Sequence, residues 1–218
     1  MKSTLVAAGL ALGVTSMALA GNTWHEDGDA GNGVNGDAQA TGTGPLAAII
    51  GSTNGNVGDE VDAYCITVVD YVNFTASLSN AGTTFDTQIW LFDANGHLVS
   101  GNDDNPAGGL QSFLQAGPND DGTPGLTANG TYIIAVSGFN NDPTDAAGAD
   151  LAIQDTFQEQ TGADGPGGAN PLGGWGGGGA TGDYEMTLTG VDGWVVPAPG
   201  ALALLGVAGL AAGRRRRH

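Results

Sequence analysis

The chain has 218 residues, a length that suits one domain between processing signals at the two ends. Its 23 Asp and Glu outnumber five Lys and Arg, and all five basic residues lie in the terminal segments. A body without Lys or Arg cannot neutralise phosphates, so its charge argues against nucleic acid and favours divalent cations or plain solvation. The 40 Gly have no Gly-X-Y period, which excludes collagen, and the single Cys65 excludes an intrachain disulfide.

Residues 1–20 are typical of a secretory signal peptide. Lys2 supplies the positive start, residues 5–14 form the apolar stretch, and Ala18 and Ala20 form the small-x-small site that signal peptidase cleaves. An uncleaved membrane helix is the alternative, but the apolar stretch is shorter than the ~20 residues that a span needs. We therefore expect an exported protein whose mature chain begins at Gly21.

The C-terminal segment, 193–218, has three parts that follow one another. The prolines of Pro197-Ala198-Pro199-Gly200 prevent a helix from extending upstream, and an apolar run follows over 201–212. Arg214, Arg215, Arg216 and Arg217 then hold the end of that run on the cytoplasmic side of a membrane. The run is short for a hydrocarbon core about 30 Å thick, so we expect a weak membrane anchor.

This tail resembles the PEP-CTERM sorting signal. The resemblance implies processing by an exosortase-like sorting enzyme and a location in the cell envelope, anchored by the C-terminal helix or secreted after the tail is processed. Ala198 stands where the namesake motif has Glu, so anchoring is the firmer expectation and a plain hydrophobic helix the alternative. The same motif is also labelled an ice-binding-protein C-terminal domain, a label that does not imply ice binding.

The body is predicted to be built from short strands. Segment 21–43 is acidic, rich in Gly and Asn and without periodicity, which predicts a flexible lead-in. The domain proper, 44–192, contains segments with β character at 46–50, 63–69, 72–79, 87–92, 97–100, 112–115, 131–137 and 183–189. In 72–79 the alternation places Val72, Phe74, Ala76 and Leu78 on one buried face.

Asp93-Ala94-Asn95-Gly96 predicts a tight hairpin turn between two of these segments. We predict an all-β fold: a single β-sandwich, jelly-roll-like, with about seven or eight short strands and long Gly-rich loops, flanked by the signal helix and the C-terminal hydrophobic helix. The long stretch 139–181 is expected to be either functional or disordered.

The body resembles bacterial pre-peptidase C-terminal (PPC-type) β-sandwich modules and their secreted relatives. The matching segments are DAGNGVNGDAQATGTGPLAAIIGS, DEVDAYCITV, FDTQIWLFDANGHLVSGNDDN, NGTYIIAVSG and GDYEMTLTG. The resemblance implies a non-catalytic accessory module that mediates binding or assembly.

The chain offers little for catalysis. His25 lies in the lead-in, His97 follows a hairpin turn, and His218 ends the chain, so none has a rigid setting for a base. Cys65 in a predicted strand is expected to be a small packed residue. We therefore expect no enzyme.

Acidic clusters on loops suit calcium, which prefers hard oxygen ligands. They lie at 59–62, 102–105, 119–122 and 141–142. The strongest candidate metal ligands are Asp86, Asp103 and Asp104, because the hairpin 87–100 brings its open ends to one edge. The alternative is that these residues only form turns on a solvated surface, since no EF-hand spacing is present.

Two functions stay open. The first is a non-enzymatic protein of the cell envelope or extracellular matrix, sorted through its tail, with a structural or adhesive sandwich. The alternative is a calcium-dependent secreted module that binds an extracellular polysaccharide or a protein, with exposed Trp90 or Trp175 as a stacking surface.

Overall fold

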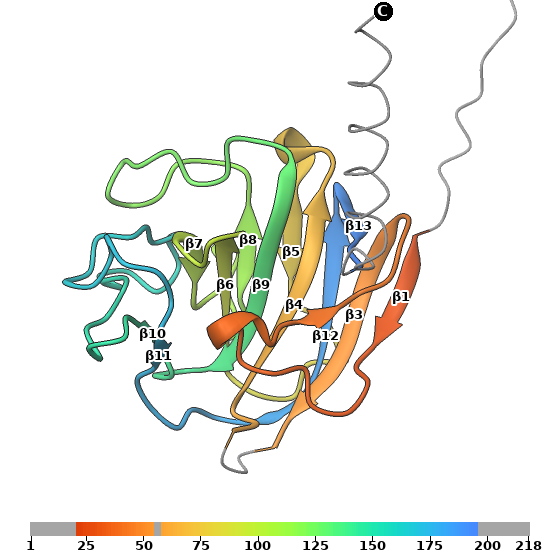
Figure 1. The fold of residues 1–218 in the computed structure, drawn as a ribbon, viewed down its shortest axis with the longest axis horizontal. Helices are drawn as coiled ribbons and strands as arrows, with labels where there is room; N and C mark the ends of the chain where they lie inside the picture. Colours follow the sequence, from red (N-terminus) through yellow and green to blue (C-terminus); the bar gives the residue numbers. More distant parts are fainter. Residues whose placement is uncertain (1–20, 55–57, 196–218) are drawn as a thin grey trace, which may run out of the picture.

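The computed structural model describes residues 21–54 and 58–195, and within them the fold is all-β. Thirteen strands and two single-turn 3-10 helices, Val34–Gly36 and Tyr71–Asn73, make up its regular structure (Figure 1). The signal peptide and the C-terminal helix expected from the sequence lie outside the described residues. In the described part of the chain, no helix has the length and apolar character to cross a membrane.

The first sheet has five strands in the order β1-β3-β12-β5-β8. They are β1 Asn22–His25, β3 Leu46–Thr53, β12 Gly182–Thr189, β5 Thr75–Ser77 and β8 Phe113–Gln115. Only β1 runs parallel to its neighbour, and the other pairs are antiparallel. The sheet therefore joins segments from both ends of the body.

The second sheet has the order β13-β4-β9-β6-β7, and β2 adds to β4 in parallel. Its strands are β13 Val191–Gly193, β4 Val61–Val68, β9 Gly130–Gly138, β6 Thr87–Asp93, β7 Leu98–Asn102 and β2 Gln39–Ala40. The chain passes from β12 of the first sheet to β13 of the second at Gly190. This residue has φ of 74°, and a Cβ there would lie 2.5 Å from the Asp70 carbonyl oxygen, so only glycine fits.

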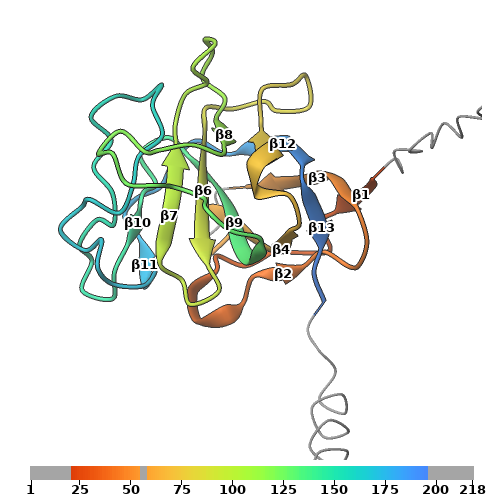
Figure 2. The same ribbon diagram turned by 90° about the horizontal axis from the view of Figure 1, so that it is seen from above.

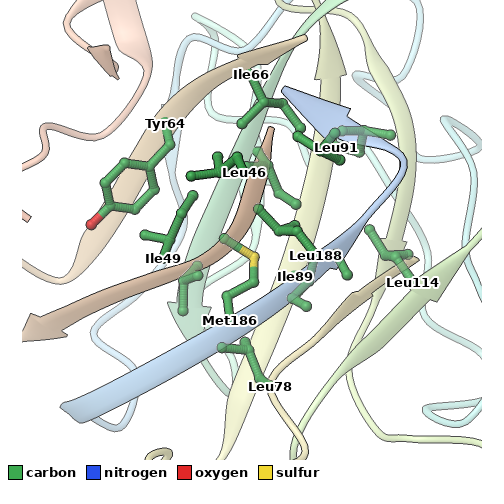
Figure 3. Packing of buried hydrophobic residues seen from close by; sticks show 14 of the residues in the cluster. Leu46, Ile49, Tyr64, Ile66, Leu78, Ile89, Leu91, Leu114, Met186 and Leu188 are labelled. Carbon is green, nitrogen blue, oxygen red and sulfur yellow. The ribbon is translucent and has the colours of Figure 1, made fainter. Parts of the chain in front are cut away.

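Both sheets bury side chains in one hydrophobic cluster (Figure 3). In β12, Tyr184, Met186 and Leu188 alternate with exposed or half-buried residues, so one face points inward. The facing strands β4, β6 and β9 contribute every second residue to this cluster from the second sheet, for example Ile66 and Ile89. The cluster thus joins the two sheets through their inner faces.

The long segment 139–181 covers the outer face of the second sheet beside β6 and β7 (Figures 1 and 2). It contains the short antiparallel pair β10 Pro143–Thr144 and β11 Gly174–Trp175. Leu151, fully buried, joins a second hydrophobic cluster that includes Trp90 and Phe92 of β6. Six of the seven residues of β6 are therefore buried, because side chains on both its faces are covered.

Each strand segment expected between 46 and 189 corresponds to an observed strand, with shifted ends. The clearest error is in 72–79. Phe74, Ala76 and Leu78 are buried as expected, but Val72 is 65% exposed because the chain turns through a 3-10 helix at Tyr71–Asn73. The Asp70 carboxylate accepts a hydrogen bond from the backbone N–H of Asn73, which fixes that turn.

The boundary expected at residue 44 lies within the fold. Part of the lead-in 21–43 forms β1 and β2, Ala30 reaches the main core cluster, and the Trp24 indole donates to Gln39 Oε1 at 2.8 Å. The domain in the structure therefore begins at β1. The two strands could not be predicted from the sequence, because they are very short and the Gly and Asn residues around them indicate turns.

Candidate functional site: an acidic cluster at the open end of a hairpin

Strands β6 and β7 form the hairpin on which the cluster is built. At its turn the Gly96 N–H donates to the Asp93 carbonyl at 3.0 Å, and the Asp93 carboxylate accepts from the backbone N–H groups of Asn95 and His97. The strands pair antiparallel as far as Ile89 with Asn102. Residues just before β6 and just after β7 consequently meet at the same edge.

Asp86, Asp103 and Asp104 come together at this open end. One carboxylate oxygen of each residue lies within 4.8 Å of the others. Asp103 is 1% exposed and Asp104 is 8% exposed, whereas Asp86 is half-buried. The juxtaposition expected from the hairpin is therefore present in the fold.

Asp103 is buried without a hydrogen-bond donor on its Oδ1, and Asp86 Oδ1 is in the same state. A buried polar atom without a partner costs about 1–3 kcal/mol, so such atoms are normally completed by water, a proton or a bound ion. These two oxygens are the features that point to a bound cation.

The long segment 139–181 closes over the cluster. Gln158 Nε2 donates to Asp104 Oδ2 at 2.8 Å, and the Asp104 N–H donates to the Phe157 carbonyl at 2.8 Å. At the start of the segment, the Phe139 N–H donates to the Asp86 carbonyl at 3.1 Å. The rings of Phe139 and Phe157 meet edge to face, with centroids 5.7 Å apart. The cluster thus connects the hairpin to two points of the segment 139–181, which we call the covering segment.

The electrostatics of the cluster disfavour three ionised carboxylates. Burial raises the pKa of Asp103 to about 7, and the carboxylates of Asp104, Asp86 and Asp142 add to the effect. Burial and the Asp104 carboxylate also raise the pKa of Asp86. At 4.8 Å, the upper limit of their separation, two unit charges repel by about 3 kcal/mol at an effective dielectric constant of about 20. Because the described residues include no Lys or Arg, protons or a cation must balance these charges.

The donor set fits calcium. Calcium takes about six to eight oxygen ligands at about 2.3–2.6 Å, from carboxylates, carbonyls and water, in flexible geometry. Three carboxylates supply the anionic part of such a set. The arrangement has no His or thiolate that would favour zinc.

Two of the other acidic clusters are structural. Asp121 Oδ1 accepts from the backbone N–H and the hydroxyl of Thr123 at 2.8 and 2.6 Å, so it forms a turn. Asn141 accepts from the Gly177 N–H, and Asp142 accepts from Gln88 Nε2 at 2.9 Å. The expectation of a turn former on the surface therefore fits Asp121, whereas Asn141 and Asp142 are buried or half-buried and bond to distant parts of the chain.

The remaining acidic cluster, 59–62, gains a partner that the sequence did not indicate. Glu26, from the lead-in, joins Asp59 and Asp62, again with one carboxylate oxygen of each within 4.8 Å of the others. The acidic residues of the lead-in can be seen in the sequence, but the position of Glu26 beside Asp59 and Asp62 depends on the parallel pairing of β1 with β3.

The histidines and the cysteine have little catalytic support in the described residues. His25 is exposed, and His97 Nδ1 lies 3.7 Å from the Asp93 carboxylate at the hairpin turn, where the two side chains are 48% and 38% exposed. His218 lies outside the described residues. Cys65 Sγ faces the Ala38 carbonyl at 3.8 Å, and burial raises the pKa of its thiol, which disfavours the reactive thiolate.

The two tryptophans expected at the surface differ from each other. Trp90 is fully buried, and its indole donates to Ser137 Oγ at 3.0 Å, so it cannot stack on a ligand. Its burial follows from the cover that 139–181 provides. Trp175 is partly exposed and lines a groove of about 550 Å³ together with Asn32, Glu60 and residues 173–178.

Comparison with known proteins finds no family model, no curated protein and no solved structure that matches this chain. The resemblances to PEP-CTERM tails and PPC-type modules therefore stay predictions from the sequence. The cleavage residues Ala18 and Ala20, the sorting motif at 197–200 and the arginine run lie outside the described residues.

Proposed function

We propose that this chain is an exported, non-enzymatic β-sandwich module of the cell envelope, whose fold is completed by a calcium ion at Asp86, Asp103 and Asp104. The observation that carries the proposal is Asp103, a buried carboxylate with an oxygen that no donor reaches, beside two further carboxylates. A calcium ion would satisfy that oxygen and balance the charge of the cluster.

The classification as a jelly-roll-like sandwich is part of the proposal. Two sheets that share one hydrophobic cluster, with alternating inward side chains, are typical of sandwiches. Export rests on the signal peptide and tail read from the sequence. Outside the cell, modules that bind calcium with dissociation constants of about 10⁻⁴ to 10⁻³ M are common, so a site with few protein ligands suffices there.

In this proposal calcium has a structural role. The ion would hold the open end of the β6–β7 hairpin against residues 157 and 158 of the covering segment, whose contacts lie beside Asp104. The covering segment forms a large part of the surface beside the second sheet. An adhesive or matrix role would then use a surface that is ordered when calcium is present.

A second candidate function is binding of an extracellular polysaccharide, favoured by the groove at Trp175. The indole Nε1 donates to the Asn32 carbonyl at 2.9 Å, which leaves the half-buried ring at the groove. Calcium would act on this groove indirectly, by ordering the segment that carries Trp175. Binding to acidic and neutral polysaccharides, measured for the full chain and for Trp175→Ala, tests this candidate.

Thermal unfolding of the full chain with calcium and with EDTA, at equal ionic strength, tests the main proposal. A ligand that binds only the native state at about a hundred times its dissociation constant stabilises it by about 2.7 kcal/mol. For a domain of this size the melting temperature should rise by roughly 5–10 °C. An unchanged melting temperature at about 10–100 mM calcium, a hundred times those dissociation constants, contradicts the proposal.

Export is tested separately by intact mass spectrometry of the protein from its native envelope. A mass that corresponds to a start at Gly21 and an end near Ala198 supports signal cleavage and tail processing. An intact arginine tail on a cleaved N-terminus supports anchoring without processing, and an uncleaved N-terminus contradicts the signal-peptide prediction.

A further inference from the structure

A second group of carboxylates lies where the segment after β1 meets the start of β4. Glu26 follows β1, Asp59 lies in the connection between β3 and β4, and Asp62 is the second residue of β4. One carboxylate oxygen of each lies within 4.8 Å of the others. None of these residues belongs to the cluster at Asp86.

We propose that Glu26, Asp59 and Asp62 form a second divalent-cation site, with calcium as its ion, that fastens the segment after β1 to the start of β4. This site goes beyond the function proposed above, and it stands on its own residues. The two sites can therefore be tested one at a time.

Backbone donors fix Glu26 in place. Its Oε1 accepts from the Ala30 N–H at 3.2 Å, and its Oε2 accepts from the Ser52 N–H at 2.8 Å. Each carboxylate oxygen has two lone pairs, so both oxygens keep acceptor capacity for a cation. The site is thus held by the lead-in on one side and by β3 on the other.

Asp62 gives the observation that points to a ligand. It is fully buried, its Oδ2 accepts from the Tyr184 hydroxyl at 2.7 Å, and its Oδ1 has no donor. Tyr184 gives its one hydroxyl proton to Asp62, so the Tyr64 hydroxyl, 2.6 Å away, must donate to Tyr184. Both phenol protons are then used, and neither can serve Asp62 Oδ1.

Asp59 repeats the pattern, because its Oδ1 is also buried without a donor. Two carboxylate oxygens without donors thus lie close to a third carboxylate, with no positive charge among them. Asp29 lies near enough to add its negative charge to the group, and the described residues include no Lys or Arg that could compensate this charge. A dication supplies both the missing contacts and the missing charge.

A proton is the competing occupant. Burial raises the pKa of Asp62 to about 8, with the Tyr184 hydrogen bond acting against that rise, so Asp62 can also become neutral by protonation. A proton would satisfy one oxygen but would not connect Glu26 to Asp59. The two occupants therefore differ in what they do to the lead-in, which makes them separable by experiment.

The lead-in is the part of the molecule that this site would stabilise. Between β1 and β2 it places Ala30 in the main core cluster, and the Gly31 carbonyl accepts from the Ala63 N–H at 2.8 Å. The cation would close this loop next to its Glu26 end. Loss of the cation should loosen the loop before the rest of the domain, because local openings require less free energy than global unfolding.

Hydrogen exchange of the full chain, read by mass spectrometry in calcium and in EDTA at equal ionic strength, tests the proposal. Peptides from 26–33 should exchange more slowly in calcium, by about 100-fold at a hundred times the dissociation constant. Asp62→Asn should remove this calcium dependence, while Asp103→Asn should retain it. Asp27→Asn, an exposed neighbour of Glu26 with the same charge change, should also retain it.

Asp59→Asn is a second variant, to be used if Asp62→Asn fails to fold, that is, if its core strands lose their protection from hydrogen exchange. It too should remove the calcium dependence of 26–33. The proposal is overturned if 26–33 exchange equally in calcium and EDTA, the outcome expected for a proton at Asp62. It is also overturned if folded Asp62→Asn and Asp59→Asn both respond to calcium as the unmodified chain does.

Discussion

At the scale of single residues, hydrogen-bond donors separate two kinds of aspartate. Asp145 accepts from the backbone N–H groups of Ala147 and Ala149 and from the Asn170 amide, all at 2.8–2.9 Å. The Ala149 and Asn170 donors hold the pKa of Asp145 below its usual value. Asp103 and Asp62 each retain a buried oxygen without a donor, and burial raises the pKa of both. Donor supply, more than acidity, therefore marks the candidate cation sites.

The pH dependence of stability follows from these two residues. The pKa of Asp103 is raised from 3.8 to about 7 and that of Asp62 from 3.8 to about 8, so the folded state holds protons that the unfolded state has released. Stability must then fall as pH rises through this interval. In EDTA we expect a lower melting temperature at pH 8 than at pH 5, and a smaller decline in calcium. A melting temperature in EDTA that rises over this range contradicts the assignment.

Tyr184 supports Asp62, and its hydroxyl can be removed with little change of shape. Tyr184→Phe leaves Asp62 Oδ2 without its donor and Tyr64 without its acceptor. A buried polar group left unpaired costs about 1–3 kcal/mol, and we expect a loss of that size in denaturant unfolding. Tyr71→Phe, at a residue 37% exposed, is the matched control and should have almost no effect. Equal losses of stability in the two variants would mean that the hydrogen bonds from Tyr64 to Tyr184 and from Tyr184 to Asp62 add nothing to stability.

At the scale of elements, the long segment 139–181 is a structural layer that covers one face of the second sheet. Leu151 is fully buried in the cluster that contains Trp90 and Phe92, whereas Ile153, two residues later, is 44% exposed. Leu151→Ala should lower the free energy of unfolding by about 2–5 kcal/mol, because it opens a cavity. Ile153→Ala should change it by less than about 0.5 kcal/mol. Similar values for the two variants would show that the segment is not packed in solution.

The strands show which elements the sequence can predict. Alternation or apolar runs located β3, β4, β6 and β9, because these strands are long enough to carry a pattern. Strands β1, β2 and β13 have two to four residues and depend on tertiary pairing, so they left no pattern to read. The burial of Trp90 was missed for a related reason, since its cover comes from a Gly-rich segment without periodicity.

At the scale of the molecule, the two carboxylate clusters differ in how far the sequence could predict them. Asp86, Asp103 and Asp104 flank one hairpin, so local topology was enough to bring them together. Glu26 reaches Asp62 only after β1 has paired with β3 and β4 has entered the other sheet. No local pattern encodes that meeting, because it depends on how the sheets are assembled.

The charge of the whole molecule links the two clusters. The chain carries a formal net charge of −18, and its described residues hold no Lys or Arg. Such a charge destabilises the compact state through self-repulsion. Bound calcium would reduce this repulsion where carboxylates are buried closest together. Salt screens exposed charges more than buried ones, so sodium chloride should substitute only in part.

Calorimetric titration of the full chain with calcium, at constant ionic strength, tests the central claim most directly. The unmodified chain and Asp155→Asn, an exposed site in the covering segment, should bind calcium alike. Asp103→Asn, with the same change of charge, should bind one ion fewer. Equal stoichiometry and affinity in all three proteins, or no binding to the unmodified chain at millimolar calcium, would contradict a calcium site at Asp86, Asp103 and Asp104.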